Sequence, residues 1–427
     1  MRNDLIPKVR RSVVTAGLVG FVASPALRRH PYRGYRWLQR FDPMHDSPLG
    51  IWVLSRHGDV TAALRNPLLG SDESKADASL LRLGGIERLL SRGHRSVEER
   101  GPFQQMFSRL MLFRDPPDHT RLRGLVAKAF TPRRAESLAP RIAELVDEIL
   151  DRVAPAGHME LMRELAYPLP ARVICELLGV PRQDEELIVA QAPALAVGLD
   201  PSPMRTAVAV AAADLAATVI GDYLADLIAL RRRQPGDDLL SALIEAEEGG
   251  AGLDHDELVA TAMLLLIAGH ETTANLIGNG MLALLRHPRQ LEQLRRDPGL
   301  DRPAVDELLR FDSPVQMVQR IALDDVTISG TTIPKGHIVV LCTGAANRDP
   351  AAFHEPNQLD LGRSPNPHLA FGGGAHFCIG APLARIEARL VIGRVIRRFP
   401  GLHMTGRTEH WRPSFTIRGL EALPLAW

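Results

Sequence analysis

Apolar residues recur at three- and four-residue spacing over several long stretches of the chain, which is the spacing of one face of an α-helix. The clearest stretches are 138–153, 207–233 and 252–286. In the last of these the segment LVATAMLLLIAG is apolar on every side, so we expect this helix to run through the middle of the protein. Asp254 is suited to cap its N-terminus, and Pro288 lies just beyond its expected end.

Strand signals are short and few. The clearest are IWVLS at 51–55 and the stretch 326–342, which reads as two or three strands joined by turns that contain glycine. No linker, low-complexity tract or fixed repeat divides the chain. We therefore expect a mainly α fold with small β-sheets, organised as a single domain over residues 31–427 after an N-terminal extension at residues 1–30.

Charge and cysteine usage exclude some partners and favour one compartment. Lysine and arginine number 51 against 50 acidic residues, for a net charge of +1, and basic blocks are missing. This balance argues against nucleic acid as the main partner. Three cysteines without paired spacing argue against a disulfide framework and favour a reducing compartment.

One cysteine lies in a distinctive setting. Cys378 falls in the glycine-rich string FGGGAHFCIG at 371–380, directly before a helical pattern. Such a loop brings backbone close to a flat partner, and N–H groups at the start of the following helix favour a thiolate. Without the resemblance described below, a packed core cysteine and a metal ligand are equally good interpretations of Cys378. Cys175 and Cys342 lie in apolar runs, which predicts that they are small buried hydrophobic residues.

The string resembles the haem-binding pattern of the cytochrome P450 family, F-x-x-G-x-H-x-C-x-G, at each of its fixed positions: Phe371, Gly374, His376, Cys378 and Gly380. The resemblance extends from about residue 31 to residue 427. It implies the family fold, haem b (iron protoporphyrin IX) as cofactor, and Cys378 as the axial thiolate ligand of the iron.

The expected central helix carries AGHETT at 268–273, where a carboxylate and two hydroxyls beside a glycine are costly unless they have partners or a task. We expect Thr272 to bond a carbonyl one turn earlier and the hydrogen-bond ladder to open at Gly269. The alternative is that the two threonines satisfy only the backbone while Glu271 pairs with a buried arginine. The string resembles the family's oxygen-activating motif, which implies that Thr272 and Glu271 are the catalytic alcohol and acid.

Further residues match positions that contact the haem or support its pocket. Glu307, Arg310 and Arg363 match the family's buried ion network, to which the resemblance assigns a structural role. The residues that we expect to bind the cofactor are His119, Arg123, Ala268, Gly269, Thr272, Arg320, Phe371, Gly372, His376, Cys378 and Gly380. Among them His119, Arg123, Arg320 and His376 are expected to bind the haem propionates.

The expected pocket walls over the haem are 80–107, 192–204, 315–318 and 415–417, which hold apolar side chains with few fixed charges. The resemblance thus implies a monooxygenase that inserts one oxygen atom of O2 into a small hydrophobic organic substrate. Its electrons would come from a separate ferredoxin, or flavodoxin, and an NAD(P)H-dependent reductase. We expect a monomer, with a helix face that includes Arg385 and Arg389 either solvated or docking an acidic partner.

The first 30 residues leave localisation open. Lys8, Arg10 and Arg11 precede the apolar stretch 13–22, and RRSVV resembles a twin-arginine export signal. The apolar stretch is short for a bilayer span of about 20 residues. We favour an extra helix and a cytoplasmic enzyme, where electron donors are found; membrane association or export through residues 1–30 is the alternative.

Three other functions fit a haem protein with these motifs. A peroxide-driven peroxygenase of the same fold would need no electron partner, although the Glu271–Thr272 pair argues against it. A non-catalytic helper protein would have lost Cys378 or the oxygen-activating residues, which are present here. A gas- or ligand-sensing haem protein would show no spectral shift with hydrophobic ligands.

Overall fold

The computed structural model describes residues 24, 29–47, 50–77, 101–196, 206–248, 252–406, 409–414 and 416–427. Most of the extension at residues 1–30 lies outside these ranges, as do 80–100 and 197–204 of the expected pocket walls and Phe415. The expectations for those segments stay predictions.

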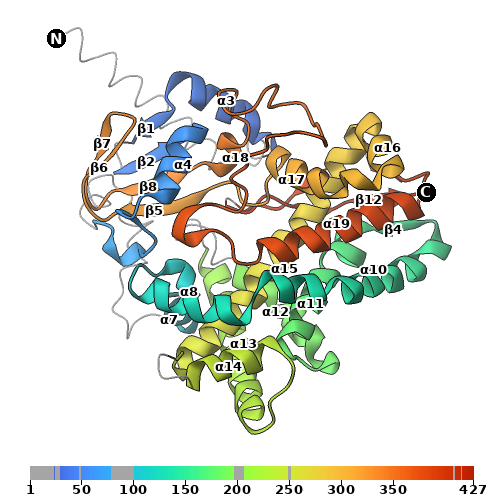
Figure 1. Ribbon diagram of the computed structural model, residues 1–427, viewed down its shortest axis with the longest axis horizontal. Coiled ribbons are helices and arrows are strands. Elements are labelled where there is room, and N and C mark those ends of the chain that lie inside the picture. Colours follow the sequence, from blue (N-terminus) through green and yellow to red (C-terminus); the bar gives the residue numbers. More distant parts are fainter. Residues whose placement is uncertain are drawn as a thin grey trace.

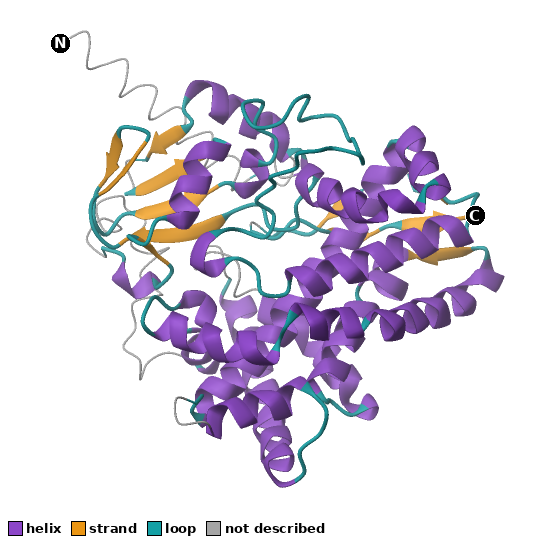
Figure 2. Ribbon diagram, viewed as in Figure 1, coloured by secondary structure: helices purple, strands orange, loops and turns teal. Residues whose placement is uncertain are grey.

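Helices make up most of the described chain (Figure 2). Their bounds are α3 Pro31–Phe41, α4 His57–Arg65, α7 Pro102–Phe107, α8 Asp118–Ala129, α9 Pro132–Ser137, α10 Ala139–Val153, α11 Pro168–Leu178, α12 Glu185–Ala196, α13 Ala207–Arg233, α14 Leu239–Glu248, α15 His255–Arg286, α16 Pro288–Arg296, α17 Asp301–Phe311, α18 Thr343–Ala346 and α19 Ala381–Arg398. The strands are β1 Met44–Asp46, β2 Ile51–Leu54, β3 Leu69–Gly70, β4 His158–Glu160, β5 Val318–Ala322, β6 Val326–Ile328, β7 Thr331–Ile333, β8 Ile338–Leu341, β9 His403–Met404, β10 His410–Trp411, β11 Leu420–Ala422 and β12 Pro424–Ala426. The expected mainly α fold with small sheets is confirmed.

The helix α15 is the centre of the fold, as its apolar sequence predicts. It begins with a capping box, in which the Asp254 side chain accepts a hydrogen bond from Glu257 N–H and the Glu257 side chain accepts one from Asp254 N–H. It packs against α11, α13, α17 and α19, so nearly every position along its length is buried. In Figure 1 it runs across the molecule beneath α19.

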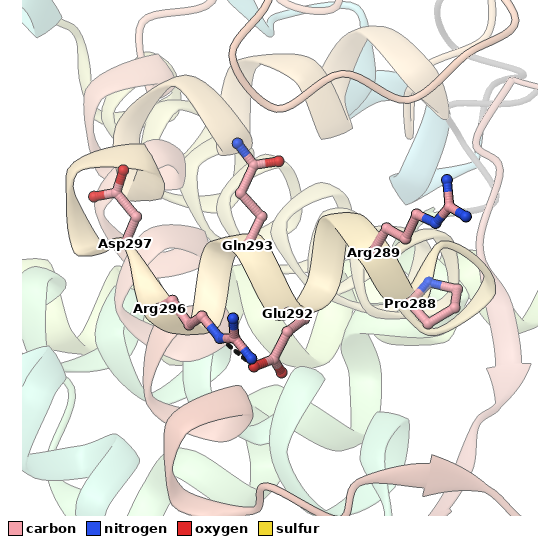
Figure 3. A pocket seen from close by; sticks show the side chains of 6 residues that line it. All are labelled: Pro288, Arg289, Glu292, Gln293, Arg296 and Asp297. Atoms are coloured by element: carbon pink, nitrogen blue, oxygen red, sulfur yellow. Dashed lines mark hydrogen bonds and ion pairs between the residues drawn. The ribbon is translucent and has the colours of Figure 1, made fainter.

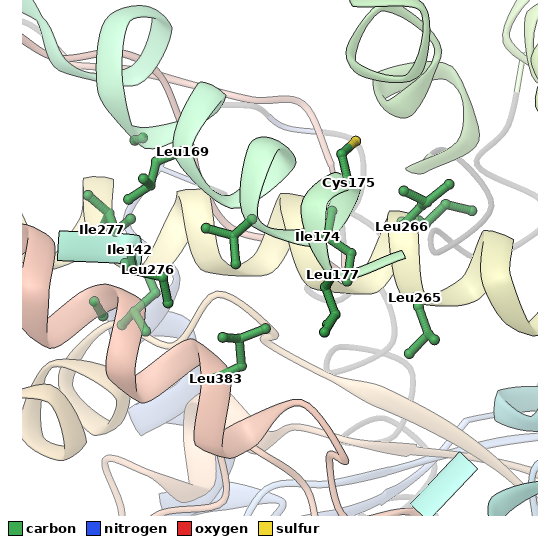
Figure 4. Close-up of a cluster of buried hydrophobic side chains, with 14 of the residues drawn as sticks. Ile142, Leu169, Ile174, Cys175, Leu177, Leu265, Leu266, Leu276, Ile277 and Leu383 are labelled. Atoms are coloured by element: carbon green, nitrogen blue, oxygen red, sulfur yellow. The ribbon is translucent and has the colours of Figure 1, made fainter. Parts of the chain in front are cut away.

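Leucine and isoleucine side chains fill the space between α15 and its neighbours. Figure 4 shows side chains of α11 facing those of α15, with Leu383 of α19 and Ile142 of α10 beside them. Cys175, on α11, is fully buried among these groups, and Cys342 is buried in a second cluster. Both cysteines are therefore the small core residues that their apolar surroundings predict.

The larger sheet joins distant parts of the chain. Its strand order is β1-β2-β8-β5-β3, with β2 parallel to β8 and the other pairs antiparallel. The stretch 326–342 forms three strands, β6, β7 and β8, as expected. Figure 1 shows this sheet on one side of the molecule and the helices α13 and α14 on another.

Among the residues that the structure describes, one helix is long and apolar enough to span a membrane. The helix α13 has 27 residues and a mean hydropathy of 1.6 in its most apolar window. It packs against α7, α12, α14 and α15, while Val208 and Leu215 near its start are exposed. Helices inside soluble proteins often pass the same test, so this composition is weak evidence for membrane contact.

Candidate active site

The loop before α19 holds Cys378 with its thiol accessible to solvent. The Cys378 N–H donates to Phe371 O at 2.9 Å, which folds the loop back on itself. Gly374 has φ +63°, and a Cβ there would lie 2.1 Å from the carbonyl oxygen of Leu64. Only glycine fits this position, because the loop crosses the α4 backbone at contact distance.

The thiol of Cys378 is open to solvent, yet enough protein surrounds it for burial to raise its pKa. The backbone N–H groups of Gly380 and Ala381 and the guanidinium of Arg123 act in the opposite direction. The expected contribution of the N–H groups at the start of α19 is thus confirmed in direction, while desolvation opposes it. A cation on the open side of the sulfur would further favour the thiolate.

Four cationic or titratable side chains gather beside this loop from three parts of the fold. His119 and Arg123 lie on α8, Arg320 on β5 and His376 in the loop itself. The rings of His119 and His376 lie 3.9 Å apart between centroids, and Arg123 Nη2 donates to Phe377 O at 2.6 Å. The structure thus brings together the predicted propionate-binding residues.

Two of these groups, His119 and Arg320, are buried, whereas Arg123 and His376 are part-buried. Arg320 is 8% exposed, and within the described residues its guanidinium donates a hydrogen bond only to Gln319 O. Burial lowers the pKa of Arg320 to about 10, and burial with the charges of Arg320 and His119 lowers the pKa of His376 to about 3. Within the described residues, neither Arg123 nor Arg320 forms an ion pair, so the cluster is suited to an anionic ligand.

The acid of the central helix is buried and paired. Glu271 Oε1 accepts hydrogen bonds from Asn275 Nδ2 at 3.1 Å and from Arg412 Nη1 in a shorter ion pair. Arg412 Nη1 also donates to Tyr167 Oη at 2.8 Å. Glu271 therefore does pair with an arginine, as the alternative to a catalytic role expected, and Arg412 is a residue that sequence reasoning missed.

The alcohol beside this acid has the expected contact. Thr272 Oγ1 donates to Ala268 O, one turn earlier, at 2.8 Å. The helix α15 is nevertheless continuous through Gly269, so the expected opening of its ladder is wrong. A Cβ at Gly269 would lie 3.4 Å from Ile174, which indicates that this glycine allows α11 to pack closely against α15.

The network around Glu307 is fully enclosed. Arg310 donates to both carboxylate oxygens of Glu307 at 2.7 Å, and the exposed fraction of each side chain is 0%. Arg363 Nε adds bonds to the same oxygens at 3.1 and 3.2 Å. Arg310 also donates to the carbonyls of Asn347, Pro356 and Gln358, so the network ties α17 to the segment that leads into the cysteine loop.

Comparison with known proteins decides the family. The family model "Cytochrome P450" matches residues 204–297 and 302–414. Cytochrome P450 107B1 of Saccharopolyspora erythraea is 43% identical over 380 residues, covering 88% of this chain and 89% of the relative. The chain belongs to the cytochrome P450 family. Vitamin D(3) 25-hydroxylase of Pseudonocardia autotrophica is 41% identical, covering 93% and 94%.

Solved P450 structures share the whole fold. The crystal structure of P450BioI, in complex with an acyl carrier protein ligated to hexadec-9Z-enoic acid, superposes with a TM-score of 0.85 at 37% identity. It covers 95% of this chain and 100% of that one. This protein is therefore a haem-thiolate monooxygenase related to bacterial P450 enzymes of secondary metabolism.

The residues present fit a haem group. An accessible thiol lies beside the buried Arg320 and the part-buried Arg123, neither of which forms an ion pair within the described residues. This is the donor set needed by an iron with two carboxylate side chains. Cys378 would hold the iron, while His119, Arg123, Arg320 and His376 would hold the propionates. Within the described chain, no cluster of three or more His, Cys, Asp or Glu side chains could hold a metal ion on its own.

The loop that holds Cys378 is also contacted by Arg385 of α19. Arg385 Nε donates to Asp306 Oδ1 at 2.8 Å, and its guanidinium lies 4.5 Å from the centre of the Phe371 ring. His368 Nε2 lies 3.1 Å from the same Asp306 oxygen. Arg385 is thus held in place on this P450, while Arg389 makes only a looser pair with Glu136 at 3.8 Å.

The surface groove in Figure 3 is not the P450 active site. It lies along α16 and is lined by Pro288, Arg289, Glu292, Gln293, Arg296 and Asp297. Two of its charged groups, Arg296 and Glu292, pair with each other at 2.6 Å. None of its lining residues comes from the cysteine loop or from the 268–273 segment.

Two of the expected pocket-wall segments contact each other. Val315 pairs with Ile417 in an isolated antiparallel bridge, and Gln316 N–H donates to Thr416 O at 2.9 Å. The segment after β10 therefore packs along the segment before β5. This brings together the two later stretches that the resemblance assigns to the substrate pocket of the P450.

Proposed function

We propose that this P450 binds haem b and hydroxylates or epoxidises a hydrophobic organic molecule in the cytoplasm, with electrons from a ferredoxin and its reductase. The observation that carries the cofactor proposal is the cluster of His and Arg side chains beside the accessible Cys378 thiol, in which neither arginine forms an ion pair within the described residues. Two propionates would supply the missing negative charge.

In this proposal a bound haem would supply the chemistry of dioxygen activation, and the side chains of α15 supply protons. Glu271 is the acid, since it is a buried carboxylate on the helix that carries the AGHETT segment. Thr272 is the alcohol that passes the proton on. Its hydroxyl would give up its hydrogen bond to Ala268 O and form one toward the haem pocket. Apolar walls exclude water and hold the substrate.

Two features support the proposed substrate class and location. The described wall residue Ile417 is buried and apolar, and two relatives act on or bind apolar molecules, namely vitamin D(3) and a 16-carbon acyl chain. All three cysteines are free thiols, which agrees with a reducing compartment. We propose a monomer, to be checked by light scattering during size-exclusion chromatography.

A spectral experiment tests the proposal. The purified protein is reduced under carbon monoxide, and its Soret band is recorded; the ferric protein is then titrated with vitamin D(3) and hexadec-9Z-enoic acid. We expect a thiolate-type band and a spectral shift with at least one of these apolar probes. A folded haem protein without that band would overturn the assignment of Cys378.

The electron source is tested separately. Product formed with ferredoxin, reductase and NAD(P)H supports a monooxygenase, whereas stoichiometric product with peroxide alone and none with ferredoxin would establish a peroxygenase. Thr272→Ala should keep the carbon monoxide band and separate oxygen consumption from product formation. Unchanged coupling in that variant would contradict the role of Thr272.

A further inference from the structure

The two oxygens of the Glu271 carboxylate have different surroundings. Both recorded bonds, from Arg412 and from Asn275, end on Oε1. Oε2 is fully buried and has no hydrogen-bond partner among the residues that the structure describes. A buried carboxylate oxygen without a donor costs free energy, so this atom is suited to a water or a proton that the protein side chains do not supply.

We infer that Arg412 is a positioning residue that anchors Glu271 through Oε1 and leaves Oε2 as the oxygen that exchanges protons. The inference rests on the proposed role of Glu271 as the acid. An anchored carboxylate keeps one oxygen in a fixed direction, which proton transfer requires because it occurs only within hydrogen-bond reach.

Arg412 is itself fixed at two points. Its Nη1 donates to Tyr167 Oη as well as to Glu271, and the Arg412 guanidinium lies 5.5 Å from the centre of the Tyr167 ring. The exposed fraction of the Arg412 side chain is 26%, against 4% for Glu271. The pair therefore runs from near the surface to a buried carboxylate, with the cation at the solvent side.

The second donor to Oε1, Asn275 of α15, lies against the same segment of the chain as Arg412. Arg412 N–H donates to Gly419 O at 3.0 Å, which closes the segment between β10 and β11. A Cβ at Gly419 would lie 1.8 Å from Asn275 Oδ1, so the backbone there touches the side chain that also holds Oε1. Arg412 thus bonds Glu271 and Gly419 lies against Asn275, while residues 416–418 between them pair with residues 314–316, which overlap the expected pocket wall.

This arrangement connects the wall to the acid. A molecule that displaces the segment 412–419 would shift Arg412 and the Gly419 contact together, and so would change the orientation of Oε2. The titratable groups that face Glu271 are Arg412 from this segment, Tyr167 from the start of α11 and His270 from α15. Of these, only Arg412 carries a positive charge at neutral pH, because burial lowers the pKa of His270.

The test measures oxygen uptake by the haem-loaded protein without substrate, driven by excess ferredoxin and reductase, across pH and in heavy water. Glu271→Gln should slow uptake by about 10²-fold, the lower range for loss of a positioned acid. Arg412→Gln should slow it by roughly tenfold, increase the solvent isotope effect and change the pH profile, because Glu271 loses the cation that holds its Oε1 in place. Arg412→Lys keeps the charge and should restore the pH profile.

Two comparisons separate positioning from general damage. Arg397→Gln removes a similarly part-buried arginine from its carboxylate, Asp301, and should leave the pH profile and isotope effect unchanged. Unfolding midpoints in urea should show coupling: Arg412→Gln lowers the midpoint, and adding Glu271→Gln to it recovers part of the loss. Gly419→Ala, which displaces Asn275, should change uptake in the same direction as Arg412→Gln.

The possible failures are distinct. If Glu271→Gln slows uptake while Arg412→Gln behaves as Arg397→Gln does, the positioning role of Arg412 is wrong and the proposed acid stands. If Glu271→Gln leaves uptake and its isotope effect unchanged, the proposed role of Glu271 is itself wrong.

Discussion

Replacing Glu307 by glutamine tests how much of the fold depends on one enclosed ion network. The substitution keeps the size of the side chain and removes its charge, which leaves Arg310 as a cation with an exposed fraction of 0%. Removing one partner of a buried pair costs about 3–5 kcal/mol. Arg363 and the Asp360 N–H also donate to this carboxylate, at 3.1 and 2.9 Å, so we expect Glu307→Gln to reach the upper part of that range.

The assay is urea unfolding followed by circular dichroism, with the loss read from the shift of the midpoint at constant slope. The matched control is Asp147→Asn, which removes an exposed partner of Arg394 at 3.1 Å and should cost about 0–1 kcal/mol. The haem content of each variant is measured in parallel, because the network ties α17 to the chain before the cysteine loop. A loss below about 1 kcal/mol for Glu307→Gln would refute the reasoning from burial.

Three further substitutions address the cofactor and the core. Cys378→Ser should abolish the thiolate-type carbon monoxide band without changing the far-ultraviolet circular dichroism, and a retained band would disprove ligation by Cys378. Arg320→Met removes a buried cation that the haem propionates would pair, so it should stabilise the haem-free protein against urea. It should also weaken haem retention by tenfold or more, on the order of 1.4 kcal/mol. Equal haem loss from the variant and the unaltered protein would contradict this. Burial raises the pKa of Glu387 from 4.5 to about 8, so the unfolded chain releases this proton earlier and the free energy of unfolding falls by about 1.4 kcal/mol per pH unit between those values. Glu387→Gln should remove that decrease, and parallel stability–pH curves for the two proteins would rule it out.

Much of the fold follows from local sequence patterns. The helix α13 spans 207–233, as its apolar spacing predicts, and Asp254 caps α15 because its carboxylate and that of Glu257 can reach each other's backbone within one turn. The loop around Cys378 was predictable for the same reason, since its glycines and its hydrogen bond from Cys378 to Phe371 lie within ten residues.

The missed contacts are those between distant segments. Arg412 is 141 residues from Glu271, and no periodicity or motif relates the two positions. Asp306 joins His368 and Arg385 in the same way, from a different helix. The sequence also showed the N–H donors beside Cys378 but not the burial that raises its pKa, because a string of residues does not show how much protein surrounds the sulfur.

The parallel pairing of β2 with β8 has a consequence for synthesis of the chain. Ile51 pairs with Ile338, so the edge of β2 that faces β8 has no partner until residue 338 has been made. At about 5–20 residues per second, the ribosome needs roughly 15–60 s to cover that distance. During this interval Trp52, Val53 and Leu54, buried in the folded protein, form an open strand edge that can pair with other chains. We therefore expect the yield of soluble protein to depend on chaperones that bind the nascent N-terminal region.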